Sequence, residues 1–201
     1  MNTVHSFEET LARDPLAQFL AWFEEARATV EQPDAVALAT ATADGRPSVR
    51  MVLLKRADED GFGFHTNLES RKARELAANP RAALLCHWQP LGRQVRVEGA
   101  VRLTPAIESE EYFRTRPVGS RLAAWASPQS RPLADREELE RLYADAAARF
   151  PGDEVPLPPH WGGFRLVPDA YEFWQHGEHR LHDRLLYERS GDGWCRQRLA
   201  P

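Results

Sequence analysis

The sequence contains little cysteine, little lysine and no long hydrophobic run. Its only cysteines, Cys86 and Cys195, are far apart and have neither the spacing of metal ligands nor that of a redox motif. No apolar segment approaches the ~20 residues of a membrane-spanning helix. The opening residues MNTVHSFEET lack a basic start and an apolar signal core. These absences argue against a secreted or membrane protein, and we expect a reducing, cytoplasmic location.

Basic residues are also slightly outnumbered, because 26 Lys and Arg stand against 30 Asp and Glu. This mild acidity argues against a protein that coats nucleic acid or an anionic membrane. Glycine-rich nucleotide-binding fingerprints are absent, so Rossmann and P-loop sites are unsupported. Among the basic residues only Lys55 and Lys72 are lysine. A coding bias explains this simply; the alternative is that these positions need a compact ammonium group.

The chain has the length of one domain, 201 residues, and 42% of them are hydrophobic, which is enough for a core. Residues 1–34 predict a helical segment. Ser6 and Glu9 have capping-box spacing, and Asp14-Pro15 is typical of a helix start. An apolar stripe at helical spacing follows and is expected to pack against the core: Phe19, Leu20, Trp22, Phe23 and Ala26.

Residues 35–201 have the pattern of one domain built from short strands. The runs AVALATAT and RPSVRMVLLK are joined by ADG and predict a hairpin, as does the SGDG turn near the C-terminus. Further strands are expected at GFGFHTN, RAALLCHW and RQVRVEGAVRL. Helices are expected at residues 70–79, at 104–117 with Thr104 as N-cap, at 118–126 and at 133–150. Many short strands without a βαβ rhythm favour an α+β fold, mainly antiparallel β, with a small barrel.

Two groups of basic residues could bind an anion. Ser70, Arg71 and Lys72 fall where a helix should begin, and cations there oppose the helix dipole unless an anion is present. This group predicts a phosphate cradle, with a solvated basic helix start as the alternative. In RMVLLK, strand alternation separates Arg50, Val52 and Leu54 from Met51, Leu53 and Lys55. A basic residue stands at each end of this otherwise apolar strand, and Lys55 is a candidate for contact with a phosphate or carboxylate. The alternative is that both basic side chains simply reach solvent.

A third group is Tyr112 and Arg116, which are four residues apart on one predicted helix face, followed by Ser120. Their hydroxyl and guanidinium groups are good phosphate donors. Surface packing is the alternative interpretation.

The fourth group is the run WQHGEHRLHDR, in which Trp174 could stack on a flat ring. His176, His179 and His182 recur every three residues and raise the question of a metal site. On an extended strand His179 would face away from the other two, which fits a three-ligand site poorly. An anionic or flat aromatic ligand is favoured over a metal, and a polar turn remains the alternative.

Longer motifs carry a resemblance to a known family. They are RMVLLK, TNLESRKA, RQVRVEG, YFRTRP, WASPQS, EVPLPPHWGGFR, EFWQHGEHRLHDR and the terminal RLAP. From about residue 35 to Pro201 the chain resembles pyridoxamine (pyridoxine) 5′-phosphate oxidase. The resemblance implies a split β-barrel homodimer with FMN at the subunit interface. It also implies oxidation of pyridoxine or pyridoxamine 5′-phosphate to pyridoxal 5′-phosphate, with O2 reduced to H2O2. The composition already argues against a nucleic-acid or membrane partner.

The same resemblance implies roles for individual residues. Lys55, Tyr112, Arg116 and Ser120 would bind the substrate phosphate. Arg180 and His182 would cover the substrate ring and act as the catalytic pair, and no metal is implied. Gln129 and Ser130 would reach FMN from the other subunit. The full set of implied FMN contacts is Arg50, Met51, Val52, Leu53, Leu54, Lys55, His65, Thr66, Ser70, Arg71, Lys72, Gln94, Gln129, Ser130, Trp174 and Arg184.

Two departures and two alternative functions accompany the resemblance. His65 stands where a tyrosine is common, and His176 stands where a glycine is common. A related FMN oxidase acting on another flat substrate, such as a phenazine precursor, would share the flavin motifs. A non-catalytic protein that binds FMN or pyridoxal phosphate would use the same groups. The complete substrate set favours the vitamin B6 activity.

Overall fold

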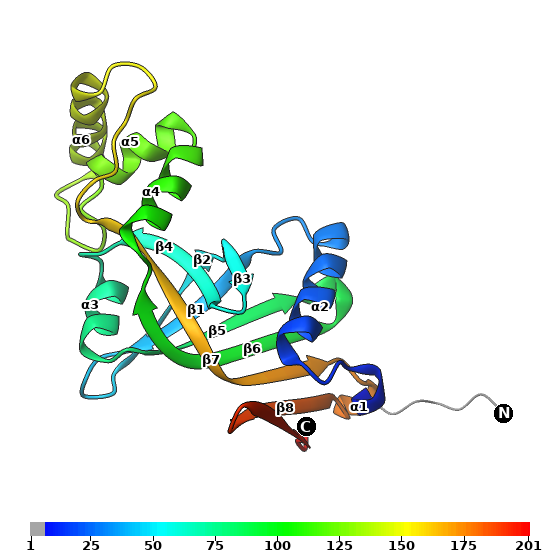
Figure 1. The fold of residues 1–201 in the computed structure, drawn as a ribbon. Coiled ribbons are helices and arrows are strands. Elements are labelled where there is room, and N and C mark those ends of the chain that lie inside the picture. The colour runs from blue at the N-terminus through cyan, green and yellow to red at the C-terminus, as the bar shows by residue number, and fades with distance from the viewer. Residues whose placement is uncertain (1–6) are drawn as a thin grey trace.

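The computed structural model describes residues 7–201. These residues form a nine-stranded antiparallel sheet with helices around it (Figure 1). Along the main path the strand order is β2-β1-β5-β6-β7-β4-β3, with β8 and β9 continuing from β7. The predicted antiparallel class is confirmed. The strands are β1 (Ala35–Ala41), β2 (Pro47–Leu53), β3 (Arg56–Asp58), β4 (Gly61–Asn67), β5 (Arg81–Trp88), β6 (Arg93–Leu103), β7 (Trp161–Gln175), β8 (Asp183–Ser190) and β9 (Gly193–Arg198).

The sheet curls into a partial barrel around the long strand β7. One edge of β7 pairs with β6, while its other edge pairs first with β4 and then with β8. The β6–β7 register shifts between Glu98 and Gly99. Gly99 is needed at this bulge, because a Cβ there would lie 2.0 Å from the Val167 carbonyl oxygen. Lys55 N donates to Gly63 O at 2.8 Å and thereby joins the end of β2 to β4.

Helix α2 (Pro15–Thr29), preceded by α1 (Phe7–Thr10), packs its apolar face on the curled sheet. The predicted cap at Asp14 is confirmed, because its carboxylate accepts from two backbone N–H groups of the first turn. The predicted stripe is buried except for Leu20, which is 39% exposed. The prediction that Leu20 packs against the core is therefore wrong. Ser6, the other predicted cap, lies outside the described residues.

The helices between the strands are α3 (Arg71–Ala78), α4 (Ala106–Thr115), α5 (Val118–Ala126) and α6 (Arg136–Arg149), with short 3-10 turns η1 (Gln89–Leu91) and η2 (Glu178–Arg180). Helices α4–α6 stand together beyond one end of the barrel (Figure 1). The predicted N-cap at Thr104 is wrong. Pro105 occupies the cap position, and the Thr104 hydroxyl lies 3.1 Å from the hydroxyl of Ser109 instead.

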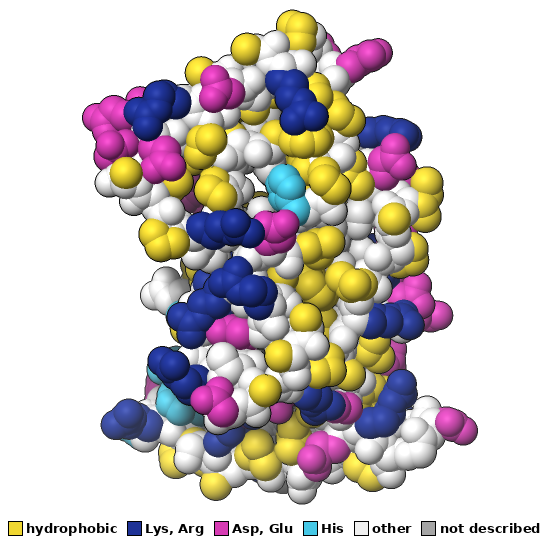
Figure 2. All heavy atoms as spheres, turned by 90° about the vertical axis from the view of Figure 1, so that its left-hand side faces the viewer, with side chains coloured by type: hydrophobic (Ala, Val, Ile, Leu, Met, Phe, Trp, Pro, Cys, Tyr) yellow, Lys and Arg dark blue, Asp and Glu magenta, His cyan; other side chains and the backbone are white. Residues whose placement is uncertain are grey.

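Figure 2 shows the face of the molecule on the α3 and α6 side, where Lys and Arg side chains gather beside a band of hydrophobic side chains. This face therefore presents both cationic and apolar surface. Within residues 7–201, no helix has the length and apolar character needed to cross a membrane.

Candidate functional site

A cavity of about 610 Å³ lies between β2, the end of β4, the start of α3 and the α4–α5 pair. Strands and helices from distant parts of the sequence thus line one cavity. All four residues predicted for the substrate phosphate and half of those predicted for FMN line this cavity: Met51, Val52, Leu53, Lys55, His65, Thr66, Lys72, Tyr112, Arg116, Ser120 and Gln129.

Lys72 supplies a buried cation to the cavity, with only 8% of its surface exposed. Its Nζ donates to Thr66 Oγ1 at 3.0 Å and to Gln129 Oε1 at 2.8 Å. Neither partner is charged. Burial, followed by the charge of Arg50, lowers the pKa of Lys72 to about 8. An anion in the cavity would give this ammonium a negatively charged partner, which Thr66 and Gln129 do not provide.

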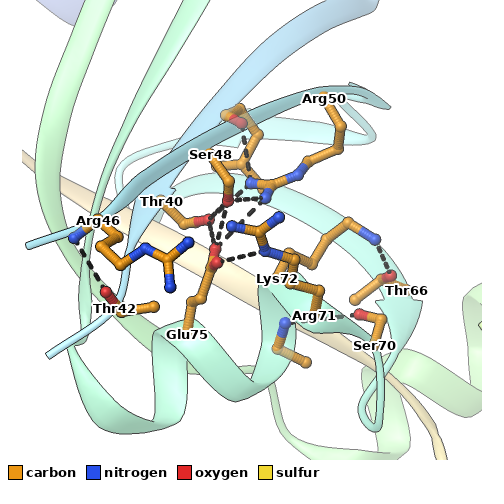
Figure 3. A network of polar contacts seen from close by, with 12 residues as sticks. Thr40, Thr42, Arg46, Ser48, Arg50, Thr66, Ser70, Arg71, Lys72 and Glu75 are labelled. Atoms are coloured by element: carbon orange, nitrogen blue, oxygen red, sulfur yellow. Dashed lines mark hydrogen bonds and ion pairs between the residues drawn. The ribbon is translucent and has the colours of Figure 1, made fainter. Parts of the chain in front are cut away.

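Arg50 and Arg71 lie beside this wall and share one buried carboxylate (Figure 3). Arg71 opens α3, and its Nε donates to Glu75 Oε1 at 2.8 Å. Arg50 comes from β2, and its Nη2 lies 3.4 Å from Glu75 Oε2. Ser70 is the N-cap of α3, with its side chain accepting from Ala73 N. The predicted helix start at SRK is thus confirmed, and its binding of a phosphate stays a prediction.

A stack of three rings forms another wall. The centroid of the His65 ring lies 4.4 Å from that of Tyr112 and 5.1 Å from that of Trp161, and Arg116 lies over Trp161 at 5.0 Å. Gly163 leaves room for the His65 ring, because a Cβ at residue 163 would lie 2.8 Å from a carbon of that ring. Burial, followed by the charge of Arg116, lowers the pKa of His65 to about 4, so the imidazole is neutral near pH 7.

Three nitrogen atoms in this wall are buried without a hydrogen-bond partner in residues 7–201: Nδ1 and Nε2 of His65 and Nη1 of Arg116. Burying a donor or acceptor without a partner costs about 1–3 kcal/mol. A polar ligand at this wall would meet that demand.

Lys55 also lines the cavity, but its charge already has a partner. Its Nζ lies 2.7 Å from Asp34 Oδ2, and both side chains are about one quarter exposed. The Lys55 ammonium therefore already has a carboxylate partner in its own chain. Tyr112 and Ser120 line the same cavity as Lys55, as the predicted substrate set requires.

The predicted alternation along RMVLLK holds in β2. Arg50 and Val52 are half-buried, whereas Met51 and Leu53 are exposed. Leu54 follows the strand and lies in the core at 4% exposure, so its side chain does not line the cavity.

Gln129 lines the cavity of its own chain, and its expected contact with FMN of the other subunit stays a prediction. The segment after α5 returns to the end of β4, where Gln129 Oε1 accepts from Thr66 Oγ1 at 2.8 Å. The next residue, Ser130, is exposed, has a positive φ of 70° and does not line the cavity.

A second group of predicted site residues lies at the other end of β7. Gln94 is opposite Trp174 across β6 and β7, and Trp174 is opposite Arg184 across β7 and β8. Directly opposed residues share one face, so the three form a row. Trp161 lines the cavity at the start of this 15-residue strand, so about 40 Å of extended strand separates it from Trp174. One chain alone does not bring this row to the cavity.

Arg180 and His182 belong to the same distant end. The His182 ring lies 4.6 Å from the Trp174 ring and 5.3 Å from the His176 ring. The extended strand assumed for this run is wrong, because β7 ends first and η2 forms a turn in which His179 and Arg180 have positive φ. The turn, and not strand alternation, brings His176 and His182 together. Residues 7–201 contain no group of three side chains arranged as metal ligands.

Three residues near the site were missed by the sequence reasoning. Trp161 had no assigned role although it lies in the quoted PLPPHWGGFR motif. Glu75 is four residues after Arg71, a spacing that predicts an ion pair on a helix. Asp34 carries no local signal, because only the fold brings it to Lys55.

Together, the fold and the cavity define a half-barrel protein whose cavity combines unneutralised cations with an aromatic wall. Comparisons with known proteins place the chain more narrowly. The family profile described as pyridoxamine 5′-phosphate oxidase matches residues 23–148, and the profile of the pyridoxine 5′-phosphate oxidase C-terminal dimerisation region matches residues 161–201. The chain belongs to the pyridoxamine 5′-phosphate oxidase family.

Individual relatives agree with this assignment. The chain is 60% identical to a pyridoxine/pyridoxamine 5′-phosphate oxidase of Rubrobacter xylanophilus over 94% of this chain and 87% of the relative. It is 58% identical to the enzyme of the same name from Anaeromyxobacter dehalogenans, over 94% and 96%.

Solved structures extend the comparison. PhzG from Burkholderia lata, in complex with tetrahydrophenazine-1-carboxylic acid, is 35% identical, with a TM-score of 0.91 over 100% of this chain and 99% of that one. An FMN-binding protein of Nostoc punctiforme related to the family is 18% identical, with a TM-score of 0.75 over 95% and 100%, and supports the predicted split-barrel fold alone.

Proposed function

We propose that this protein is an FMN-dependent oxidase that converts pyridoxine or pyridoxamine 5′-phosphate to pyridoxal 5′-phosphate. The alcohol and O2 yield the aldehyde and H2O2, and the amine reaction also consumes water and releases ammonia. The observation that carries the proposal is one cavity holding two cations, Lys72 and Arg116, that form no ion pair with a carboxylate in residues 7–201. The identity of the relatives supports the same activity.

The residues present suit FMN. A phosphate needs several positive donors at close range, and Lys72, Arg50 and Arg71 lie together at the N-terminal end of α3. Thr66 and Gln129 add a hydroxyl and an amide on the Lys72 side. When bound, FMN would accept two electrons from the substrate and pass them to O2.

The substrate phosphate suits the other side of the cavity. Arg116 offers a buried unpartnered donor, and Lys55, Tyr112 and Ser120 line the same cavity. The ring stack beside them gives a flat substrate an aromatic surface. These residues would bind and orient the substrate, which is mainly proximity catalysis.

A homodimer would complete the site. Trp174, Arg184, Arg180 and His182 lie away from the cavity of their own chain, within the segment that matches a dimerisation region. One face of β2 carries exposed hydrophobic residues, with Val49 at 68% and Met51 at 62% exposure. A two-fold dimer burying this face would let one chain supply the cavity and its partner the C-terminal row. Arg180 and His182 would then orient the substrate ring.

The proposal is tested with purified protein. We expect a protein that is yellow as purified, or that retains yellow colour after FMN is added and the excess removed, because the cationic groups at the start of α3 would hold the FMN phosphate. Added aerobically, pyridoxine 5′-phosphate should give pyridoxal 5′-phosphate and an equal amount of H2O2. A protein that binds FMN but forms neither product would instead be a binding protein. A protein that binds no FMN would contradict the proposal.

One other substrate class is favoured by a particular observation, the match to PhzG bound to tetrahydrophenazine-1-carboxylic acid. That compound carries a carboxylate and no phosphate, so it would leave part of the Lys55, Tyr112, Arg116 and Ser120 set unused. Turnover of both compounds under the same conditions separates the two activities.

The affinity for FMN should fall as the pH rises through about 8. Burial lowers the pKa of Lys72 to about 8, and a phosphate dianion would favour its charged form. Protonated Lys72 is therefore present below pH 8 and is lost above it. We expect binding to be about 10-fold weaker at pH 9.5 than at pH 7, measured by quenching of flavin fluorescence.

The matched control for this pH dependence is Lys72→Met. This variant should bind FMN more weakly at both pH values and should lose most of the difference between them. An unchanged pH slope in Lys72→Met would assign the titration to another group.

A further inference from the structure

Glu75 is the most enclosed carboxylate near the cavity, with 4% of its surface exposed. Four side chains donate to it (Figure 3). Thr40 and Ser48 donate to Oε2 from β1 and β2, and Arg50 Nη2 lies 3.4 Å from the same oxygen. Arg71 donates to Oε1 from within α3. The carboxylate thus connects the β1–β2 hairpin to the first turns of α3.

The environment keeps Glu75 ionised. Burial alone would raise its pKa, but the hydrogen bonds from Ser48, Thr40 and Arg71 hold the pKa down at about 2. A buried carboxylate that is fully bonded in this way is rigid, since each oxygen has its own set of donors. It is therefore suited to fix the positions of the groups that bond to it.

The two arginines are held in different ways. Arg50 donates through Nη1 to Leu38 O at 3.0 Å and to Thr40 Oγ1 at 2.7 Å, so several protein groups fix its guanidinium. Arg71 is 55% exposed and is held through Nε. In residues 7–201 no hydrogen bond engages its Nη1 or Nη2. These two nitrogens form the fork that grips a phosphate in a bidentate way.

We infer that Glu75 is a positioning residue for phosphate recognition: it holds Arg50 and Arg71, from separate elements, as one preformed anion-binding pair beside Lys72. This inference rests on the proposed FMN site. Without the carboxylate, the like charges of the two guanidiniums and of Lys72 repel, and the exposed Arg71 side chain loses its anchor. The effect acts through the arginines, because Glu75 itself would repel a phosphate.

The test is Glu75→Gln, with binding of FMN and of riboflavin measured separately on the apoprotein. Glutamine keeps the shape, but its NH2 group places a donor against donors on one side, so at least one arginine is released. We expect FMN binding to weaken about 10-fold, while riboflavin, which lacks the phosphate, binds as it does to the unaltered protein. The control is Glu69→Gln, at an exposed carboxylate just before α3 that pairs with Arg131; both ligands should bind as to the unaltered protein.

Ser48→Ala provides a second variant if Glu75→Gln does not fold. It keeps the carboxylate but removes one of its donors and one acceptor of Arg50. We expect FMN binding to weaken about 3-fold with riboflavin unaffected.

The other outcomes overturn the inference. Unchanged or tighter FMN binding in Glu75→Gln would mean that Glu75 only competes with the phosphate. Equal weakening of both ligands would mean a general structural role. If the unaltered protein binds FMN in these experiments, the proposed FMN site stands even when the inference fails; if it binds no FMN, the inference and the proposed function both fail.

Discussion

Arg116→Ala should raise the KM for pyridoxine 5′-phosphate about 100-fold, with a smaller effect on kcat. Arg116 lies over the Trp161 ring and has a buried Nη1 without a partner in residues 7–201. A hydrogen bond from a charged donor contributes about 1.5–3 kcal/mol, which corresponds to about 10- to 100-fold in affinity. Steady-state kinetics at saturating FMN measure both constants.

Arg114→Ala is the matched control for this prediction. Arg114 lies in the last turn of α4, two residues before Arg116 at the C-cap, is 67% exposed and pairs with Glu110, away from the cavity. Its loss should leave KM within about 2-fold of the original value, as for most exposed ion pairs. An unchanged KM in Arg116→Ala would show that this residue does not bind the substrate phosphate.

Mixing two inactive variants should restore about a quarter of the original activity, if the site is built from two chains. One variant, Lys72→Met/Arg116→Ala, destroys the cavity half. The other, Arg180→Ala/His182→Ala, destroys the C-terminal half. After unfolding and refolding an equal mixture, half of the dimers are mixed, and each mixed dimer has one intact site of two. Each variant alone should be nearly inactive.

Two variants of the same half provide the control. A mixture of Lys72→Met with Arg116→Ala leaves every site with an altered cavity half, so activity should not rise above the mean of the two. Failure of the first mixture to regain activity, with mixed dimers detected by tags of different size, would place the whole site within one chain.

Local sequence patterns predicted most of the secondary structure. The β5 and β6 strands were expected at RAALLCHW and RQVRVEGAVRL, and the structure places both strands there. Turn residues and alternation are local signals, so they survive in the fold. The three-residue strand β3 was not predicted, because it is stabilised only by pairing with β4. The division of the chain after residue 34 stays a prediction.

Candidate site residues were predictable as types but not as an arrangement. Lys55 and Lys72 were singled out because lysine is so rare in this chain, and both line the cavity. Their difference was not predictable. Lys55 meets Asp34, whereas Lys72 meets only neutral groups, and this contrast depends on which elements the fold brings together.

The sequence by itself determined the antiparallel class, the helix starts at Asp14 and Ser70, and the supply of cationic and aromatic residues, because these depend on neighbours within one or two turns of chain. Only the tertiary structure decided which residues share the cavity. The curl of the sheet places Trp161 at the cavity and Trp174 some 40 Å along the same strand. Strand length and long-range pairing set that separation, and no local pattern in the sequence encodes it.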